Sequence, residues 1–448
     1  MNVRKQIPKY KEGSFITGAL NDFKTDNHFQ LFTNLAKYGE IVRFNLGTEP
    51  VIFISNPQYI KYILQENYKN YKKDYFYKDL SLALGQGLVT SEGDYWRQQR
   101  KLIQPTFHRH SISNFAEIIR QETLITLKNW QSLKDKRVNF VEEMKTLTLS
   151  IISKCLFSVD MRDDAQSLGW IINDLIEYLN FRMELLIKIP GKPILPTARH
   201  LRFKKNYSKV VSALTHIIDE KRKDLNEPRD MLDMLILAQD EETGLGMTNQ
   251  QLIDEVITMF LAGHETTAHS IMWCYYLLNK HEDVYDKFRS SLGELGSTEN
   301  ITMEEIMNSE YTEWLINETM RFFPVVWGIG REAIIDDEID GYKIPKGKAV
   351  MVPILYMHHH PDYWDNPEKF SPDRFKDLDL QKDKKWIYMP FGEGPRKCIG
   401  NNFALLEMQI ILTLLTKEFT ITIENLGDIQ AHNGVTTRPH QDFFAQLH

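Results

Sequence analysis

Apolar residues recur at helical spacing over most of the chain. The longest such pattern runs from Leu252 to about Lys280, and Thr248 with Gln251 before it form a capping-box sequence that begins a helix. A second pattern covers residues 402–419, with apolar positions every three or four residues. The chain therefore predicts two long helices, the first about 45 Å in length at 1.5 Å per residue.

Patterns typical of strands are confined to the two ends of the chain. Residues 41–46 and 51–54 predict a hairpin, residues 331–353 are rich in short strands, and residues 420–424 alternate as a strand. Because helices dominate elsewhere, the expected fold class is mostly α (α+β). It combines a large helical body with a smaller antiparallel β region and is not doubly wound.

The long helical region between these strands, residues 57–240, is interrupted by turn signals at 85–87, 191–193 and Pro196. No repeat, low-complexity tract or flexible linker divides the sequence. We therefore expect residues 1–448 to form a single folding unit, without a fused reductase.

Charge and composition exclude several classes of protein. The 448 residues are 42% hydrophobic and carry a net charge of −7, which argues against a general nucleic-acid binder. Cys155, Cys274 and Cys398 lie far apart, so we expect a reducing compartment and neither a disulfide framework nor a structural zinc site. No apolar stretch approaches 18 residues, so we expect a cytoplasmic protein with no membrane span.

Cys398 stands in a glycine-rich segment, residues 391–400, directly before the second predicted helix. Unpaired N–H groups at a helix start favour a thiolate over a thiol. Gly394 and Gly400 allow the backbone to turn tightly and to approach a flat group closely. A buried structural cysteine is the alternative interpretation of a single Cys at this position.

This segment resembles the haem-ligand loop of the cytochrome P450 family, Phe-x-x-Gly-x-Arg-x-Cys-x-Gly. Its fixed positions are filled here by Phe391, Gly394, Arg396, Cys398 and Gly400. The resemblance implies that these residues contact a haem b cofactor, iron protoporphyrin IX. It also implies that the Cys398 thiolate is the axial ligand of the iron.

The middle of the longest predicted helix carries a second match, residues 262–267. Gly263 costs roughly 1 kcal/mol relative to Ala in mid-helix, which close approach of a flat cofactor would explain. Thr266 is expected to bond to the Ala262 carbonyl and bend the helix. Resemblance to the acid–alcohol pair of the family implies that Glu265 and Thr266 deliver protons and that Ala262 and Gly263 lie against the cofactor. A buried helix with a closely packed Gly and Thr is the alternative interpretation.

Trp96 and Arg100 lie one helical turn apart, which makes a good clamp for a carboxylate. The resemblance implies that they hold a haem propionate, with Arg331 and Arg396 at two further propionate-binding positions. Surface charge is the alternative interpretation of Arg331 and Arg396.

Glu318 and Arg321 are three residues apart on one predicted helix face, where they pair. Residues 370–375 resemble the Pro-Glu-Arg-Phe segment of the family, with Asp373 in place of the glutamate. The resemblance implies that Glu318, Arg321 and Arg374 form a structural ionic core and take no part in catalysis.

Residues 97–116 contain no acidic residue but include Arg97 and Lys101, and Lys397 lies in the cysteine segment. This pattern fits either a basic patch that docks an acidic electron carrier or a solvated helix face. His358–His360 are interpreted as structural, because consecutive residues of a regular element cannot all point at one ion.

By the same resemblance, several loops line a pocket for a lipophilic substrate, because apolar and aromatic residues occupy the positions concerned. The segments are residues 75–88 and 170–189, with the residues near 325 and 435. The expected contact residues are Tyr77, Leu82, Val325, Val326, Trp327 and Val435. Trp327 is bulky and is expected to narrow the cavity above the iron.

The resemblance covers nearly the whole chain and implies a haem-thiolate monooxygenase. Such an enzyme inserts one atom of O2 into a lipophilic substrate of the fatty-acid, terpenoid or steroid type. Since no flavin, nicotinamide or iron–sulfur motif is found, a ferredoxin or flavodoxin with its reductase is expected to donate electrons.

Two alternatives stay open. One is a peroxide-dependent haem enzyme, a peroxygenase, against which the intact Glu265–Thr266 pair argues. The other is a non-catalytic haem protein that senses or binds ligands.

Overall fold

Helices make up most of the chain in the computed structural model, which describes residues 5–14, 17–47, 49–158, 168–184, 197–223, 225 and 227–448. In chain order the α-helices are α1 (Leu20–Lys24), α2 (His28–Ala36), α3 (Pro57–Lys61), α4 (Tyr77–Leu84), α5 (Gly93–Ile103), α6 (Arg109–Ser132), α7 (Phe140–Phe157), α8 (Leu168–Glu184), α9 (Ala198–Lys223), α10 (Met231–Leu237), α11 (Asn249–Lys280), α12 (Glu282–Leu292), α13 (Met303–Met307), α14 (Glu310–Phe322), α15 (Ile354–Met357) and α16 (Asn401–Glu418). Short turns of 3₁₀ or π helix occur between them, among them the 3₁₀ turn Gly394–Arg396.

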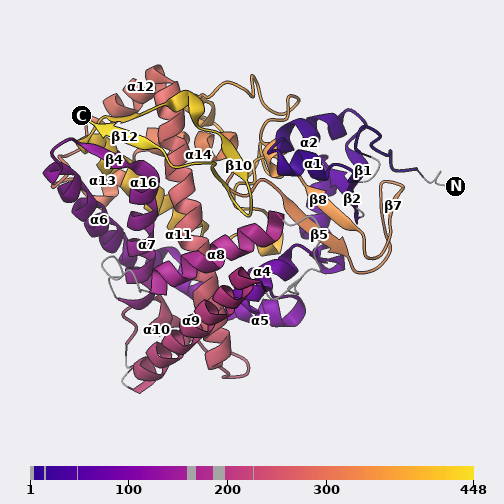
Figure 1. The fold of residues 1–448 in the computed structure, drawn as a ribbon, viewed down its shortest axis with the longest axis horizontal. Helices are drawn as coiled ribbons and strands as arrows, with labels where there is room; N and C mark the ends of the chain where they lie inside the picture. The colour runs from indigo at the N-terminus through magenta and orange to yellow at the C-terminus, as the bar shows by residue number, and fades with distance from the viewer. Residues whose placement is uncertain are drawn as a thin grey trace.

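The strands are short and fall mainly at the two ends of the chain. They are β1 (Ile41–Leu46), β2 (Glu49–Ile54), β3 (Tyr71–Lys73), β4 (Arg137–Asn139), β5 (Ile329–Ala333), β6 (Asp337–Ile339), β7 (Tyr342–Ile344), β8 (Ala349–Val352), β9 (Ile421–Ile423), β10 (Ala431–Asn433), β11 (Thr437–Pro439) and β12 (Phe444–Leu447). In Figure 1 the helical body lies on the left, and β1, β2, β5 and β8 lie with α1 and α2 on the right.

The largest sheet in the described chain joins strands that are far apart in sequence. Its order is β1-β2-β8-β5-β3, with β2 and β8 parallel and the other neighbours antiparallel. Apolar side chains of this sheet and of α2 form one buried cluster, and those of the helices form another. The pairing of β3 with β5 brings residues near 72 and 332 side by side, which positions part of the site described below.

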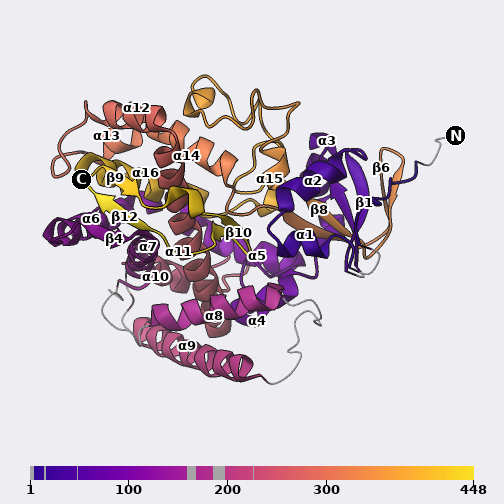
Figure 2. The ribbon, with the colours of Figure 1, turned by 45° about the horizontal axis from the view of Figure 1, so that its top comes forward.

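The central helix of the body is α11, which crosses the helical body in both views (Figures 1 and 2). Its N-terminus has the predicted capping box, because the Thr248 hydroxyl accepts from the Gln251 N–H and the Gln251 side chain accepts from the Thr248 N–H. Most of its residues from Leu252 to Leu278 are buried, since the helix has neighbours on every side.

The predicted fold class is confirmed, as are the two long helices, the β1–β2 hairpin and the strand near residue 421. The short strands β3 and β4 lie inside the region predicted to be helical, and β10, β11 and β12 were not predicted. The largest sheet is also not purely antiparallel. The predicted breaks at 191–193 and Pro196 lie outside the described residues.

The three residues of the predicted ionic core meet in the structure. The Arg321 guanidinium donates to both Glu318 oxygens at 2.7 and 2.9 Å, and Arg374 Nε donates to Glu318 Oε1 at 3.0 Å. Glu318 and Arg321 are completely buried. Arg374 also donates to the backbone carbonyls of Asp365 and Lys369, so the core fastens α14 to the segment that leads to Cys398.

His358 adds a second link between α14 and that segment. Its Nε2 accepts from the Met389 N–H at 2.8 Å, so Nδ1 carries the proton and donates to the Met320 carbonyl at 3.2 Å. Burial holds the pKa of His358 well below its usual range, which keeps this neutral form. His358 is therefore held by the protein itself, and not by an ion.

Substitution Glu318→Gln should lower the free energy of unfolding by about 3–5 kcal/mol, because it leaves the buried Arg321 charge without its counter-ion. Denaturant titration of the purified protein measures the change. The control is Lys287→Ala, which removes an ion pair with Asp373 in which both side chains are about half exposed, and should cost at most about 1 kcal/mol. Equal costs for the two variants would contradict the proposed role of the core.

Candidate functional site

The cysteine loop, residues 391–400, is closed by its own backbone. The Cys398 N–H donates to the Phe391 carbonyl at 2.9 Å, and the Lys397 N–H donates to the Gly394 carbonyl at 3.0 Å. Gly394 has a φ of +77°, and a Cβ there would lie 2.1 Å from the carbonyl oxygen of Leu64. Only glycine fits this turn, which places Cys398 just before the start of α16.

The Cys398 side chain is both accessible and enclosed. Its surface is exposed, yet burial by surrounding protein raises the pKa of the thiol, while the Gly400 N–H and the charges of Arg100 and Lys397 oppose this shift. A thiol with both properties borders a space inside the protein. Desolvation therefore opposes the thiolate that the helix N-terminus favours, and the thiolate ligand stays a prediction.

The middle of α11 is accessible where the rest of the helix is buried. Ala262 is exposed, and Gly263, Glu265 and Thr266 are half-buried, although their neighbours on both sides are covered. The Thr266 hydroxyl donates to the Ala262 carbonyl at 2.6 Å, as predicted. The helix continues unbroken through this point, so the bond does not interrupt it.

Close helix packing gives Gly263 a local reason, and its contact with a cofactor stays a prediction. A Cβ at Gly263 would lie 2.9 Å from Cδ1 of Ile152, on the neighbouring helix α7. The absent side chain therefore allows α11 and α7 to pack closely, and the space it leaves belongs to Ile152.

Glu265 lies beside two positive charges that the sequence did not connect with it. Burial raises the pKa of this carboxyl, and Arg438 and Lys145 oppose the shift. The neighbouring His264 is buried, and its Nε2 donates to the Lys145 carbonyl at 3.1 Å. Burial lowers the pKa of His264 to about 4, so it is a neutral packing residue at physiological pH.

Three basic side chains meet next to the cysteine loop and are called the cationic cluster: Lys73, Arg331 and Arg396. Lys73 on β3 stands directly opposite Arg331 on β5, although like charges opposite each other destabilise a sheet. Lys73 Nζ and Arg396 Nη1 both donate to the Ser91 carbonyl, at 2.9 and 3.2 Å. Lys73 was missed from the sequence, because the register of β3 and β5 is what brings it here.

Carboxylates also lie near the cationic cluster. Glu92 accepts from the Lys73 backbone N–H at 2.7 Å and pairs with Arg396. Burial raises the pKa of Asp74 to about 6 and that of Glu255 to about 8, so Glu255 holds a proton at neutral pH. Burial, followed by the charge of Arg396, lowers the pKa of Lys73 to about 6. At pH 7 Lys73 is therefore largely neutral, and a carboxylate bound beside it would favour its charged form.

Trp96 and Arg100 of α5 join this arrangement to the loop. The Arg396 guanidinium lies over the Trp96 ring, 4.3 Å from its centroid, and Arg100 Nη1 donates to the Lys397 carbonyl at 2.8 Å. The structure thus gathers Trp96, Arg100, Arg331 and Arg396 around the cysteine loop. A haem fits such a site, because it offers two carboxylates to the cations and an iron to the thiol.

Comparison with known proteins decides the family. Residues 8–443 match the family described as Cytochrome P450. This chain belongs to the cytochrome P450 family. The recognition made from the loop, the central helix and the ionic core is confirmed.

The chain is similar to cytochromes P450 from distant organisms. Cytochrome P450 4X1 of Homo sapiens is 29% identical over 94% of this chain and 86% of its own length. Putative cytochrome P450 132 of Mycobacterium tuberculosis is 28% identical over 91% of this chain and 90% of its own length. Cyclooctat-9-en-7-ol 5-monooxygenase of Streptomyces melanosporofaciens is 26% identical over 88% of this chain and 84% of its own length.

As a cytochrome P450, the protein is a haem-thiolate monooxygenase, and this class uses O2 and in general takes electrons from redox partners. Among the described residues, no helix is long and apolar enough to cross a membrane.

The residues predicted to touch substrate lie in different surroundings. Tyr77 lies beside Arg331, which opposes the rise that burial causes in the pKa of Tyr77. Leu82 packs against the helical core, and the Val325 carbonyl accepts from the Thr437 N–H at 2.8 Å. Val326 is exposed.

Val435 N–H donates to Asn180 of α8 at 3.4 Å, which joins the C-terminal segment to that helix. A buried ion pair of 2.6 Å between Asp79 on α4 and Arg182 on α8 joins two of the predicted lining segments. Residues 185–189 lie outside the described residues.

The Trp327 side chain makes contacts that the sequence did not indicate. Its indole N–H donates to the Gly434 carbonyl at 3.0 Å, and its ring packs against Phe23, His28 and Phe32. These aromatic contacts with the N-terminal segment hold the ring, so the expectation that it narrows a cavity above the iron lacks support.

The basic patch predicted from the sequence is largely neutralised. Arg97 pairs with Asp94, Lys101 pairs with Asp240 and Glu242, and Lys397 pairs with Glu393. These carboxylates come from neighbouring turns and from the segment before α11, which the sequence pattern did not place there. Electrostatic docking on this face therefore gains no support from the structure.

Glu407 of α16 is a buried carboxyl with no hydrogen-bond partner for either oxygen among the described residues. Burial raises its pKa to about 8, and Thr267, next to Thr266 on α11, only partly opposes this shift. Between pH 4.5 and 8 the folded state keeps a proton that the unfolded state releases. The free energy of unfolding therefore falls as pH rises through this window.

Substitution Glu407→Gln, which imitates the neutral acid, should remove this loss. At pH 8 we expect the free energy of unfolding of the variant to exceed that of the wild type by a few kcal/mol, because each unit by which the pKa of Glu407 is raised corresponds to about 1.4 kcal/mol. The difference should shrink as the pH is lowered toward 5. Denaturant titrations at several pH values measure it, with the exposed Glu241→Gln as control. A difference that does not change with pH would contradict the assignment.

Proposed function

We propose that the described site holds haem b between α11 and the cysteine loop and that the protein hydroxylates a lipophilic small molecule. The observation that carries the proposal is the cationic cluster beside an accessible, enclosed thiol. The two propionates of haem b would pair with Arg331 and Arg396 and would favour the charged form of Lys73.

Each part of the site has a role in this proposal. Cys398 would ligate the haem iron, and Trp96, Arg100, Arg331, Arg396 and the additional Lys73 would hold the propionates. Phe391, Gly394 and Gly400 shape the loop, and Ala262 offers a small accessible surface to the cofactor. When bound, the haem supplies the oxygen-activating chemistry, and its iron favours deprotonation of the thiol that coordinates it.

Proton delivery rests with α11. Because the Thr266 hydroxyl donates to the Ala262 carbonyl, its oxygen lone pairs remain available to a proton donor in the enclosed space. The raised pKa of Glu265 suits a group that holds and passes on a proton, while Arg438 and Lys145 stabilise its charged form.

A lipophilic substrate is supported by the apolar character of Leu82, Val325 and Val435 and by the name of one relative, a monooxygenase of cyclooctat-9-en-7-ol. We propose a ferredoxin or flavodoxin with its reductase as electron donor, since the sequence has no flavin, nicotinamide or iron–sulfur motif. The single catalytic unit over residues 1–448 and the cytoplasmic location remain predictions of the sequence.

Substitution Cys398→Ser should abolish the thiolate optical signature of the reduced carbon-monoxide complex, because an alcohol does not replace the thiolate ligand. The control Cys155→Ala changes a buried cysteine of α7 and should leave the signature intact. A persistent signature in Cys398→Ser would show that another residue ligates the iron.

Substitution Thr266→Ala should divert electrons from product to hydrogen peroxide and slow product formation by up to ~10²-fold, the lower range for a positioned proton donor. Thr266→Ser keeps the hydroxyl and should retain most of the coupling. The ratio of product to reductant consumed measures the effect. Turnover that needs only hydrogen peroxide, without response to reductase and ferredoxin, would favour the peroxygenase alternative instead.

A further inference from the structure

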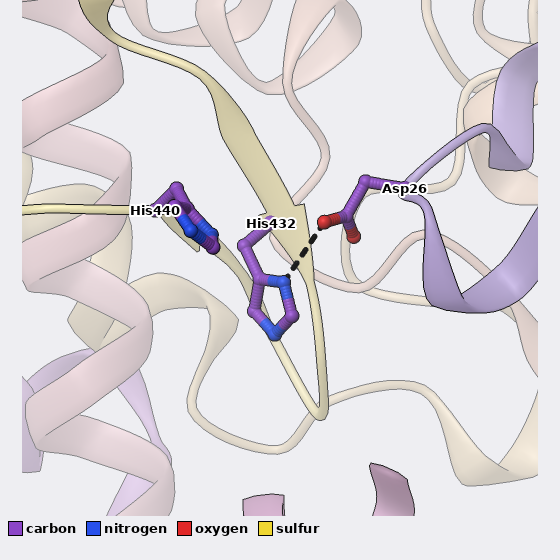
Figure 3. A group of neighbouring side chains, drawn as sticks. All are labelled: Asp26, His432 and His440. Atoms are coloured by element: carbon purple, nitrogen blue, oxygen red, sulfur yellow. Dashed lines mark hydrogen bonds and ion pairs between the residues drawn. The ribbon is translucent and has the colours of Figure 1, made fainter.

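A separate group of metal-ligating side chains lies where the N-terminal and C-terminal parts of the chain meet. Asp26 lies between α1 and α2, His432 lies in β10, and His440 directly follows β11. One ligand atom from each residue, a ring nitrogen or a carboxylate oxygen, lies within 4.8 Å of the other two. Figure 3 shows the His432 ring turned toward Asp26, with His440 close by.

We propose that Asp26, His432 and His440 form a binding site for a divalent transition-metal ion of the Zn²⁺ type. Two imidazole nitrogens and one carboxylate oxygen match the ligands that Zn²⁺ takes, and a water completes a four-coordinate site. Imidazole also suits other transition metals, whereas Mg²⁺ prefers oxygen ligands alone.

Backbone pairing places the two histidines where both can bind one ion. In the antiparallel pair β10–β11, Ala431 stands opposite Pro439 and His432 opposite Arg438. The His440 N–H donates to the Gln430 carbonyl at 2.8 Å, so the pairing continues one residue further. His432 and His440 are therefore diagonal neighbours on one face of the hairpin, within reach of a shared ligand.

Asp26 is oriented by the same hairpin. Its Oδ1 accepts from the Asn433 N–H at 2.7 Å, and its Oδ2 lies 2.9 Å from His432 Nδ1. A backbone N–H on the second carboxylate oxygen is the kind of contact that orients a metal ligand. An ion would replace the proton that His432 and Asp26 share.

A tetrahedral site needs only small adjustments of these side chains. Bonds of 2.0–2.1 Å in a tetrahedral site put ligand atoms roughly 3.3 Å apart. The 2.9 Å between His432 and Asp26 would lengthen slightly, and the exposed His440 ring has room to turn toward them. Exposure of His440 also gives the ion a path from solvent.

The hairpin next to this site contacts the proposed substrate side. The Gly434 carbonyl accepts the Trp327 indole N–H, and the Trp327 ring packs against His28, which follows the Asp26 loop. An ion bound to Asp26 and the hairpin would therefore hold Val435 in place. This consequence rests on the proposed substrate site, whereas metal binding itself does not.

Calorimetric titration of the haem-loaded protein with Zn²⁺ at pH 7.5 tests the proposal. We expect one ion to bind with a Kd in the micromolar range or tighter, and both Asp26→Asn and His440→Ala to weaken binding at least tenfold. His216→Ala, a change of an exposed histidine on α9, is the matched control and should bind as the wild type does. Zinc-edge X-ray absorption of the complex should show two imidazole ligands.

No binding of Zn²⁺ by the wild type would overturn the proposal. Wild-type affinity in both site variants would overturn it as well, because the ion would then sit elsewhere. Because His440 is exposed, the His440→Ala variant should fold. Its affinity for Zn²⁺ therefore tests the proposal even if Asp26→Asn fails to fold. Neither variant should change the thiolate optical signature of the reduced carbon-monoxide complex. A failure of metal binding can therefore be distinguished from a failure of the proposed function.

Discussion

The constraint on which the site depends is the burial of three basic side chains in one place, where burial and the charge of Arg396 lower the pKa of Lys73 to about 6. Lys73 and Arg331 face each other across β3 and β5, and Arg396 shares the Ser91 carbonyl with Lys73. A sheet gains nothing from such a pairing, so the reason for it lies outside the sheet. Carboxylates beside the cysteine loop would restore the charge of Lys73 and bind all three basic side chains, which favours a dicarboxylate.

The rest of the structure serves to keep these groups and Cys398 in one place. The parts come from β3, α5, β5 and the cysteine loop, more than 300 residues apart in the chain. The ionic core around Glu318 and the neutral His358 fix the segment before the loop. On the other side, α11 is covered almost everywhere except around Ala262, where its backbone becomes accessible.

Local patterns predicted the parts of this arrangement that depend on local chemistry. The capping box of α11, the turn at Gly394, the Thr266–Ala262 bond and the pairing of Glu318 with Arg321 all follow from residues close in sequence. Periodicity also gave the balance of helix and strand, which the fold confirms.

What the sequence did not predict depends on long-range pairing. Lys73 joins the cationic cluster only through the register of β3 with β5, and three-residue strands are too short to show alternation. The packing of Gly263 on Ile152 and the fixing of Trp327 by Gly434 need knowledge of the neighbouring element. The ion pairs of Lys101 likewise come from residues about 140 positions away.

The most direct measurement compares the binding of haem and of its dimethyl ester, in which both propionates are neutral, to protein produced without cofactor. We predict that the ester binds at least tenfold more weakly in the wild type. In a Lys73→Met variant the two affinities should move closer together, because part of the positive charge is gone. Equal binding of haem and its ester by the wild type would contradict the claim that the cationic cluster is there to hold the cofactor's carboxylates.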